Sequence, residues 1–515
     1  MAEVVVLGAG LNGLATAMLL GNDRHRVTVL ERDAAEPSGD PAELWENWDR
    51  RGVNQFRQLH FMLPRWRLVM ERELPAVIEE LDALGATRVN QIQDLPMELS
   101  GGPREGDERF ETVTARRPVL EAALSAVAAR TPGVTIRRGV TVTGLMAGPA
   151  SIAGVPHVAG VLTDEGTAIR ADLVVDASGR RSAVVGMLDA LGCRRPVEER
   201  EDSGFVYYTR HFRSRNGTLP EMRATVLQRF ESVSLLTLPC DSDTWGVAFI
   251  TAARDKRLRA LRDVEAWETA LALYPTVAPW GVGEPLTDPQ VIAGIEDRYR
   301  RFVVDGTPVV TGLVAVGDAW ACTNPSLARG TSIGLLHACG LRDLLREVGP
   351  DQAGRLAVRF DEVTETTVAP LYRMTLAFDR HRLAEIDGEI TGKPYRTSDA
   401  TWAMSKAMYA AAYRDPDVLR AYSAIAALIA TPQEVLAEPG MVGKVTTTAA
   451  GAPPYATPGP SRAELLAAID EGEPHQSRRS STRTLSEPVR APTESSVRIK
   501  VNGIGINQEP LCGSS

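Results

Sequence analysis

Hydrophobic and polar positions follow a strand–helix–strand order along the first 31 residues. Residues 4–7 are apolar at every position, which is typical of a strand buried on both faces of a parallel sheet. Residues 14–20 continue as the apolar start of a helix. Residues 26–30 form a second strand, which ends at Glu31. The pattern predicts a βαβ unit at the N-terminus.

Glycines at GxGxxG spacing join the first predicted strand to the helix. Gly8 permits the tight turn, Gly10 lets a diphosphate approach the backbone, and Gly13 lets the helix pack closely on the sheet. The free amides of the helix N-terminus would face the diphosphate, and Glu31 would accept hydrogen bonds from ribose hydroxyls. The motif alone does not separate FAD from NAD. The predicted dinucleotide-binding residues are Gly8, Gly10, Leu11, Asn12, Gly13, Glu31 and Arg32.

Two later segments also run from an apolar strand into a turn of small residues. Residues 172–180 read DLVVDASGR, and residues 312–320 read GLVAVGDAW. The second segment places Asp318 at the end of its strand. A loop containing proline and glycine follows, and a long helix is predicted over residues 331–346.

Together with the first motif, these segments resemble the FAD-binding pattern of the p-hydroxybenzoate-hydroxylase superfamily of flavoprotein monooxygenases. The resemblance implies that Asp318 binds a ribityl hydroxyl of FAD, and that the backbone at Gly330 and Thr331 faces the N1 side of the flavin. It also implies that Arg117, which begins an RxxLE segment, lies against FAD. The alternatives are a helix cap or strand-end turn for Asp318 and a solvated helix arginine for Arg117. The other residues that the resemblance implies for FAD binding are Asp176, Gly179 and Pro325.

The DASGR form of the middle motif differs from the commonest hydroxylases, because Ser178 stands in place of an aspartate. The late motif also differs, because Ala321 stands in place of a histidine. Both departures weaken the match to the aromatic-ring hydroxylases, and the DASGR form resembles the squalene-epoxidase-like branch and the epoxidases of polyether biosynthesis.

A loop after the second predicted strand carries the same resemblance. Residues 51–60, RGVNQFRQLH, resemble the RGVPQxRxxH segment of that branch, with Asn54 in place of its proline. The resemblance implies that Arg57 and His60 lie near the flavin as candidate catalytic residues. A cation there could hold the anionic reduced flavin. The alternative is that Arg57 pairs with a carboxylate and that His60 is a hydrogen-bonded core residue.

Residues 200–253 alternate as antiparallel strands do, with strands predicted at 205–212, 224–227 and 245–250. They lie between the DASGR and GDAW motifs, where the superfamily inserts its substrate domain. Strand periodicity turns two of any four consecutive side chains away from a pocket. The candidate pocket residues of the first strand are Tyr207, Tyr208, Arg210 and His211.

The predicted fold is α/β. It is a Rossmann-like FAD-binding domain with an inserted antiparallel-sheet substrate domain and a helical C-terminal region. Further helices are predicted from residue 64 to about residue 84, at 255–275, and over most of 328–436. The predicted boundaries are 1–198 and 290–348 for the FAD-binding domain, 199–289 for the substrate domain, 349–438 for the helical region, and 439–515 for a mostly disordered tail with a short helix at 462–470.

The composition disfavours several classes of binding partner. The formal charge of −9 disfavours a nucleic-acid partner. Scattered cysteines and histidines predict no metal site, and no stretch is long and apolar enough to predict an integral membrane segment. We therefore expect a soluble, cytoplasmic protein.

Residues 1–255 contain no lysine, which argues against the flavin-dependent halogenases, because these need a catalytic lysine in the N-terminal third. No second dinucleotide fold is predicted, so NAD(P)H would visit transiently, or a separate flavin reductase would supply electrons.

The resemblance implies a FAD-dependent monooxygenase. It would insert one oxygen atom from O2, through a flavin C4a-hydroperoxide, into a small, apolar, natural-product-like substrate by epoxidation or hydroxylation. Two alternatives stay open. The chain could be a flavin-dependent reductase or oxidase on the same scaffold, as isoprenoid saturases are, or a flavin-binding protein without turnover.

Overall fold

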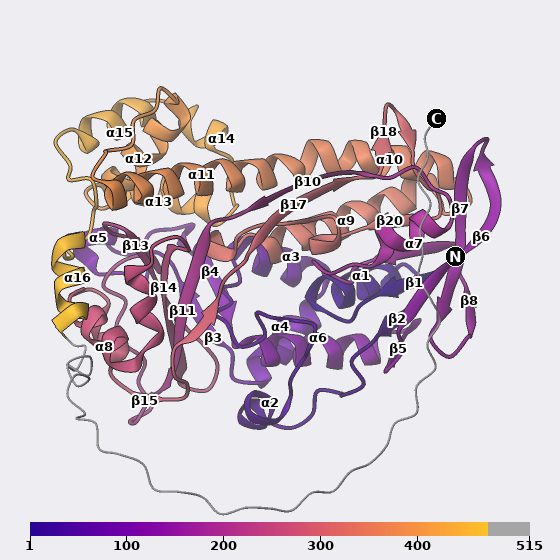
Figure 1. The fold of residues 1–515 in the computed structure, drawn as a ribbon, viewed down its shortest axis with the longest axis horizontal. Helices are drawn as coiled ribbons and strands as arrows, with labels where there is room; N and C mark the ends of the chain where they lie inside the picture. The colour runs from indigo at the N-terminus through magenta and orange to yellow at the C-terminus, as the bar shows by residue number, and fades with distance from the viewer. Residues whose placement is uncertain (472–515) are drawn as a thin grey trace, which may run out of the picture. The chain divides into compact units, whose positions relative to one another are not determined.

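The computed structural model describes residues 1–471, and a parallel sheet of five strands forms their centre (Figure 1). The strand order is β20-β9-β1-β2-β5, and every neighbouring pair is parallel. The first strand is central, so the glycine turn leaves from the middle of the sheet. The strands are β1 (Glu3–Leu7), β2 (Arg26–Glu31), β5 (Val134–Arg138), β9 (Leu173–Asp176) and β20 (Leu313–Ala315).

Side chains of β1 alternate between two buried faces, which explains why residues 4–7 are all apolar. Val4 and Val6 point into a core shared with helices. Val5 and Leu7 point into a second core, which a three-stranded antiparallel sheet covers. The helices of the first core include α1 (Leu11–Asn22), α6 (Arg117–Arg130) and α9 (Gly330–Val348), and the covering strands are β6 (Val142–Ile152), β7 (Val155–Thr163) and β8 (Ala168–Arg170).

A six-stranded sheet is inserted between β9 and β20, as the sequence predicts. Tyr207 and Ala248 lie in the core of its inner face, whereas Tyr208 and Phe249 lie in an outer core with Trp267. The sequence pattern missed β13, because all seven of its residues are buried and no polar alternation marks it. The strands are β11 (Phe205–Arg213), β12 (Leu227–Arg229), β13 (Val233–Pro239), β14 (Thr244–Ala252), β15 (Glu284–Pro285) and β16 (Gln290–Ile292), and α8 (Val264–Ala272) contributes to the outer core.

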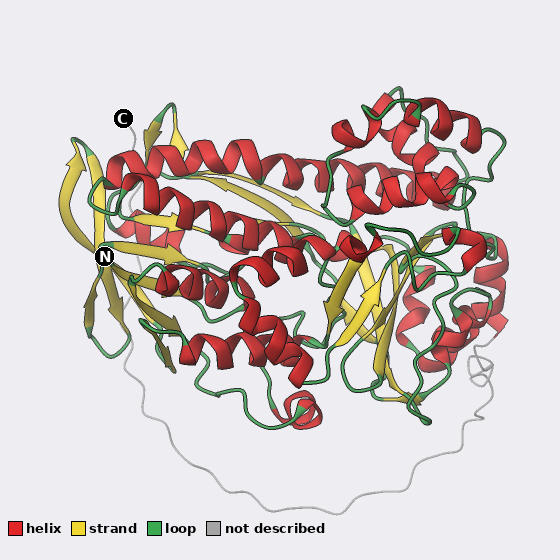
Figure 2. Cartoon of the chain, turned by 180° about the vertical axis from the view of Figure 1, so that it is seen from behind, coloured by secondary structure: helices red, strands yellow, loops and turns green. Residues whose placement is uncertain are grey.

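Long antiparallel strands link the two sheets, and helices dominate the chain after β20 (Figures 1 and 2). The linking strands are β10 (Val197–Asp202) and β17 (Glu296–Arg301), which pairs with β21 (Ala321–Cys322). The later helices are α10 (Ala353–Thr367), α11 (Ala369–Thr391), α12 (Ala400–Ala412), α13 (Pro416–Ala426), α14 (Pro432–Leu436), α15 (Met441–Ala449) and α16 (Arg462–Glu471). The predicted α/β class, with its Rossmann-like core, antiparallel insertion and helical C-terminal region, is confirmed.

Several predicted boundaries differ from the structure. The helix predicted from residue 64 to about residue 84 is two helices, because Pro75 has no N–H to continue the first. The tail predicted from residue 439 contains α15, whose Val445 is buried in the outer core. The helix predicted at 462–470 is confirmed as α16, and the disorder predicted for the last residues lies outside the described part. No helix of residues 1–471 is long and apolar enough to span a bilayer.

The remaining short elements complete the framework. The helix predicted at 255–275 begins as a 3-10 turn (Arg257–Arg262) and continues as α8. The other helices and strands are α2 (Pro41–Asn47), α3 (Pro64–Glu73), α4 (Pro75–Ala83), α5 (Met97–Ser100), α7 (Val184–Ala190), β3 (Thr87–Asn90), β4 (Glu111–Thr114), β18 (Val303–Val304) and β19 (Thr307–Pro308).

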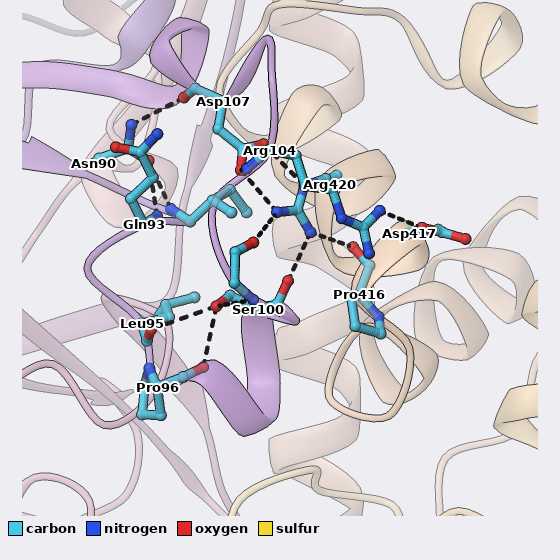
Figure 3. A network of polar contacts seen from close by, with 12 residues as sticks. Asn90, Gln93, Leu95, Pro96, Ser100, Arg104, Asp107, Pro416, Asp417 and Arg420 are labelled. Atoms are coloured by element: carbon cyan, nitrogen blue, oxygen red, sulfur yellow. Dashed lines mark hydrogen bonds and ion pairs between the residues drawn. The ribbon is translucent and has the colours of Figure 1, made fainter.

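Arg420 joins α13 to the segment that follows α5 (Figure 3). Its guanidinium bonds both oxygens of the buried Asp107, at 2.8 and 2.7 Å. It also donates to the backbone carbonyls of Ser100 (2.7 Å) and Gly102 (2.8 Å). Residues more than 300 positions apart in the sequence are thereby fixed against each other.

Candidate functional site

One cavity begins at the carboxyl ends of the parallel strands and continues to the inner face of the inserted sheet. Its empty volume is about 2370 Å³ when the part that is open to solvent is included. Leu7 and Glu31 line it where β1 and β2 end. Tyr207 and Thr209 of β11 line it at the other side. Ligands of open α/β sheets bind at carboxyl ends of this kind.

The glycine turn has the geometry that its motif predicts. Gly8 has φ +98°, a conformation that favours glycine. A Cβ on Gly13 would lie 2.0 Å from the carbonyl oxygen of Gly8, so the close packing of α1 on the sheet requires glycine there. Gly10 begins α1 without a side-chain cap and lines the cavity with Leu11 and Asn12. An uncapped helix N-terminus at a cavity offers its amides to an anion.

Glu31 lies at the end of β2, but its carboxylate already has partners. It accepts hydrogen bonds from the amides of Ala9 (2.8 Å) and Asp33 (3.0 Å), and it pairs with Arg50. Arg50 is buried, and it also bonds the buried Glu121 at 2.5 Å. Arg50 is not predictable from the sequence as a site residue, because its contact with Glu121 spans 71 positions and leaves no local pattern.

His60 and Arg117 meet at the cavity wall. The Nδ1–H of His60 donates to the carbonyl of Gln58 (2.9 Å), so Nε2 accepts from the Arg117 guanidinium (2.9 Å). Burial and the charge of Arg117 lower the pKa of His60 to about 3. His60 is therefore a neutral acceptor at neutral pH, and the cation at this position is Arg117. Arg117 is itself held by Glu121 at 2.5 Å.

Arg57 does not line the cavity, in contrast to the expectation that it lies near the flavin. It donates to the carbonyl of Trp48 (2.7 Å), and its guanidinium lies 4.7 Å from the centre of the Trp45 ring. It also lies 5.4 Å from the centre of the Phe56 ring. One nitrogen of its guanidinium, Nη1, is buried without a partner among residues 1–471, and the catalytic role of Arg57 stays a prediction.

Asp176 also lies behind the cavity wall. Its buried carboxylate accepts from the amide (3.0 Å) and the hydroxyl (2.5 Å) of Ser178, and from the hydroxyl of Ser182. It thus shapes the DASGR turn, and Gly179 of that turn lines the cavity. The serine that replaces the aspartate of the commonest hydroxylases binds Asp176.

Asp318 and the start of α9 form a part of the cavity wall beside the glycine turn, since Gly317 and Gly334 lie against Asn12. Asp318, Pro325, Gly330 and Thr331 all line it. Burial raises the pKa of Asp318, and its carboxylate accepts no hydrogen bond from residues 1–471. The buried hydroxyl of Thr331 also lacks a partner there, and α9 begins without a side-chain cap.

These features fit a flavin dinucleotide. Two uncapped helix N-termini, an unpartnered carboxylate and an unpartnered hydroxyl border one cavity. Gly10 and Gly330 leave space at the wall, since a Cβ on either would meet its nearest atom only at 4.0 Å. Arg32 also lines the cavity. Bound ribose and phosphate groups would supply the missing partners.

The inserted sheet presents alternate residues of β11 to the cavity. Tyr207 and Thr209 line it, whereas Tyr208 packs in the outer core and Arg210 pairs with Glu268 on that side. His211 lies on the inner face beyond the cavity, with its ring centre 4.8 Å from that of Trp45. Of the four candidate pocket residues, the structure thus places Tyr207 at the cavity.

Comparisons with known proteins give a relative that aligns with most of the chain. No protein-family model matches the chain. The chain is 28% identical over 402 residues to Protein Rv3254 of Mycobacterium tuberculosis, which covers 74% of this chain and 82% of that protein. A stretch of 44 residues is 50% identical to Squalene epoxidase 1 of Arabidopsis thaliana, and it covers 8% of each protein.

Solved structures share the fold. PqsL of Pseudomonas aeruginosa, described as "a probable FAD-dependent monooxygenase", has a TM-score of 0.53 and 16% identity, over 75% of this chain and 99% of that one. The flavin-dependent brominase Bmp2 has a TM-score of 0.51 and 16% identity, over 91% and 98%. The chain therefore shares its fold with PqsL and Bmp2.

Proposed function

We propose that this chain is a FAD-dependent monooxygenase that inserts one oxygen atom of O2 into a small, apolar substrate. The observation that carries the proposal is a cavity that joins the glycine turn and the start of α9 to the inner face of the inserted sheet. Such a cavity can hold a cofactor and a substrate in contact with each other. The shared fold with PqsL supports the same activity.

Bound FAD would carry out the chemistry with O2, and the protein would bind and orient the reactants and exclude water. The uncapped N-termini of α1 and α9 would hold the diphosphate and the N1 side of the flavin, and Asp318 would hold a ribityl hydroxyl. Arg117 is the cation at the wall, and the carboxylate of Glu121 fixes its position. His60 accepts one of its N–H groups, so Arg117 keeps a fixed direction toward the cavity.

Epoxidation is the favoured reaction. The squalene-epoxidase-like form of the DASGR and RGVNQ segments supports it, as does the local identity to Squalene epoxidase 1. Halogenation is disfavoured although Bmp2 shares the fold, because residues 1–255 contain no lysine. Electrons would come from NAD(P)H in a transient visit or from a separate flavin reductase.

The test follows oxygen into the product. The purified protein, loaded with FAD and reduced chemically, is mixed with an isoprenoid alkene under O2 carrying the heavy oxygen isotope. We expect a product that is heavier by one labelled oxygen atom in mass spectrometry. Flavin reoxidation that yields only hydrogen peroxide would indicate an oxidase, and a product changed only in hydrogen content would indicate a reductase. Either outcome would refute the proposal.

A further inference from the structure

The part of the cavity under the inserted sheet has apolar walls and one polar spot. The polar residues there are Tyr207 and Gln58, and the Gln58 amide oxygen accepts a hydrogen bond from Thr209 at 2.7 Å. Tyr207 and Thr209 are two residues apart on β11 and therefore share a face. The apolar walls are formed by Leu59, Phe61, Leu236, Ala248, Ile292 and Ile295.

A chain of hydrogen bonds fixes which way the Tyr207 hydroxyl points its proton. The chain ends at Asp379 of α11, a buried carboxylate that only accepts when ionised. Ser326 must therefore donate to Asp379 (2.9 Å), so it accepts from the amide nitrogen of Asn324 (3.1 Å). The amide oxygen of Asn324 then faces Tyr207 and accepts its proton at 2.6 Å.

The direction of this chain leaves the oxygen of Tyr207 as an acceptor. Its proton is committed to Asn324, and the nearby Ser326 hydroxyl is committed to Asp379. The amide nitrogen of Gln58 is a donor, and it too bonds to no group among the described residues, because its oxygen takes the bond from Thr209. Tyr207 can thus act as an acceptor and Gln58 as a donor on an otherwise apolar wall.

We propose that the substrate is an apolar molecule with one hydroxyl group, which donates to Tyr207 and accepts from Gln58. The proposal rests on the monooxygenase function and names the substrate class of the same cavity. A hydroxyl matches both partners, because it donates and accepts at one atom. A hydrocarbon would leave both groups unsatisfied, and a carboxylate would have no proton for Tyr207.

Matched probes separate these cases. The FAD-loaded protein is titrated with farnesol, its methyl ether and the corresponding carboxylic acid, and binding is followed by flavin absorbance and tryptophan fluorescence. At about pH 8, above the pKa of about 7 to which burial raises Asp379, we expect farnesol to bind roughly 5- to 10-fold more tightly than its ether. The acid should bind more weakly than the alcohol.

Tyr207→Phe should abolish the preference for farnesol over the ether, while the apolar contacts keep the ether's affinity within about twofold. Tyr208→Phe is the matched control, because Tyr208 lies on the same strand but in the outer core. That variant should keep the full preference.

Equal affinities for alcohol and ether, no binding of farnesol, tighter binding of the acid, or an unchanged preference in Tyr207→Phe would each overturn the proposal. The outcome is separate from that of the proposed function. An alcohol preference without labelled product refutes only the monooxygenase, and labelled product without an alcohol preference refutes only this inference.

Discussion

Among the cavity's carboxylates, Asp318 differs from Glu31 in having no donor within the described residues. Glu31 already bonds two amides and Arg50, so a ribose hydroxyl would have to share an occupied group. Asp318 is free to accept from a ligand, and its burial makes an empty carboxylate costly. The two residues should therefore contribute different amounts to the free energy of FAD binding.

We expect Asp318→Ala to weaken FAD binding by about 10- to 100-fold, because it removes a charge-assisted hydrogen bond. The measurement is the dissociation constant of FAD from flavin fluorescence quenching. Asp318→Asn keeps one acceptor oxygen and should lose less. An alanine variant that purifies as yellow as the wild type would refute the assignment.

In the 51–60 loop, the spacing of the motif predicts where the loop lies but not the direction or charge of its side chains. The motif located the loop at the cavity, where His60 lies. It did not show that Arg57 turns toward Trp45, because a side chain's direction depends on aromatic rings that come from another segment. It also did not show that His60 is neutral, since this follows from burial beside Arg117.

At the scale of elements, the N-terminal βαβ unit was predictable and β13 was not. β1, α1 and β2 are specified by local constraints, namely a doubly buried strand and glycines needed for the turn. β13 is buried at every position, so its sequence carries no polar alternation. Distant pairs such as Arg50 with Glu121 are also invisible locally, because only the fold brings them together.

The contact between α13 and the segment after α5 depends on Arg420 (Figure 3). We expect Arg420→Met to lower the free energy of unfolding by about 3 to 5 kcal/mol, because it leaves Asp107 charged, buried and without its main partner. Urea unfolding followed by circular dichroism measures the change.

Arg104→Met is the matched control for the Arg420 variant. Arg104 pairs with Asp417 across the same junction at 2.5 Å, but both side chains are more than 40% exposed. An exposed pair of this kind contributes less than about 1 kcal/mol. If the two variants lost the same stability, the buried pair would not anchor α13.

At the scale of the whole molecule, buried histidines make stability depend on pH. Burial lowers the pKa of His60, His211 and His337 to about 3 each. In the unfolded chain a histidine binds a proton near pH 6.5, so acidification stabilises the unfolded state first. Each contribution is present above about pH 6.5 and is lost as the pH falls toward 3. Asp379, whose pKa is raised to about 7, acts in the opposite direction.

His337 isolates one such contribution, because it lies outside the proposed site. Its Nε2–H donates to Thr364 at 2.9 Å, since the Thr364 hydroxyl donates to the carbonyl of Phe360. Its Nδ1 is buried without a partner among the described residues, so protonation there would bury an unpaired charge.

Between about pH 7.5 and 5.5, wild-type protein should lose about 1 kcal/mol more stability than His337→Gln, which cannot take up a proton in either state. Urea unfolding at both pH values, with the FAD concentration held constant, gives the difference. Glutamine keeps a donor for Thr364, so the variant should still fold. Parallel losses in the two proteins would mean that His337 binds its proton in the folded state as readily as in the unfolded one.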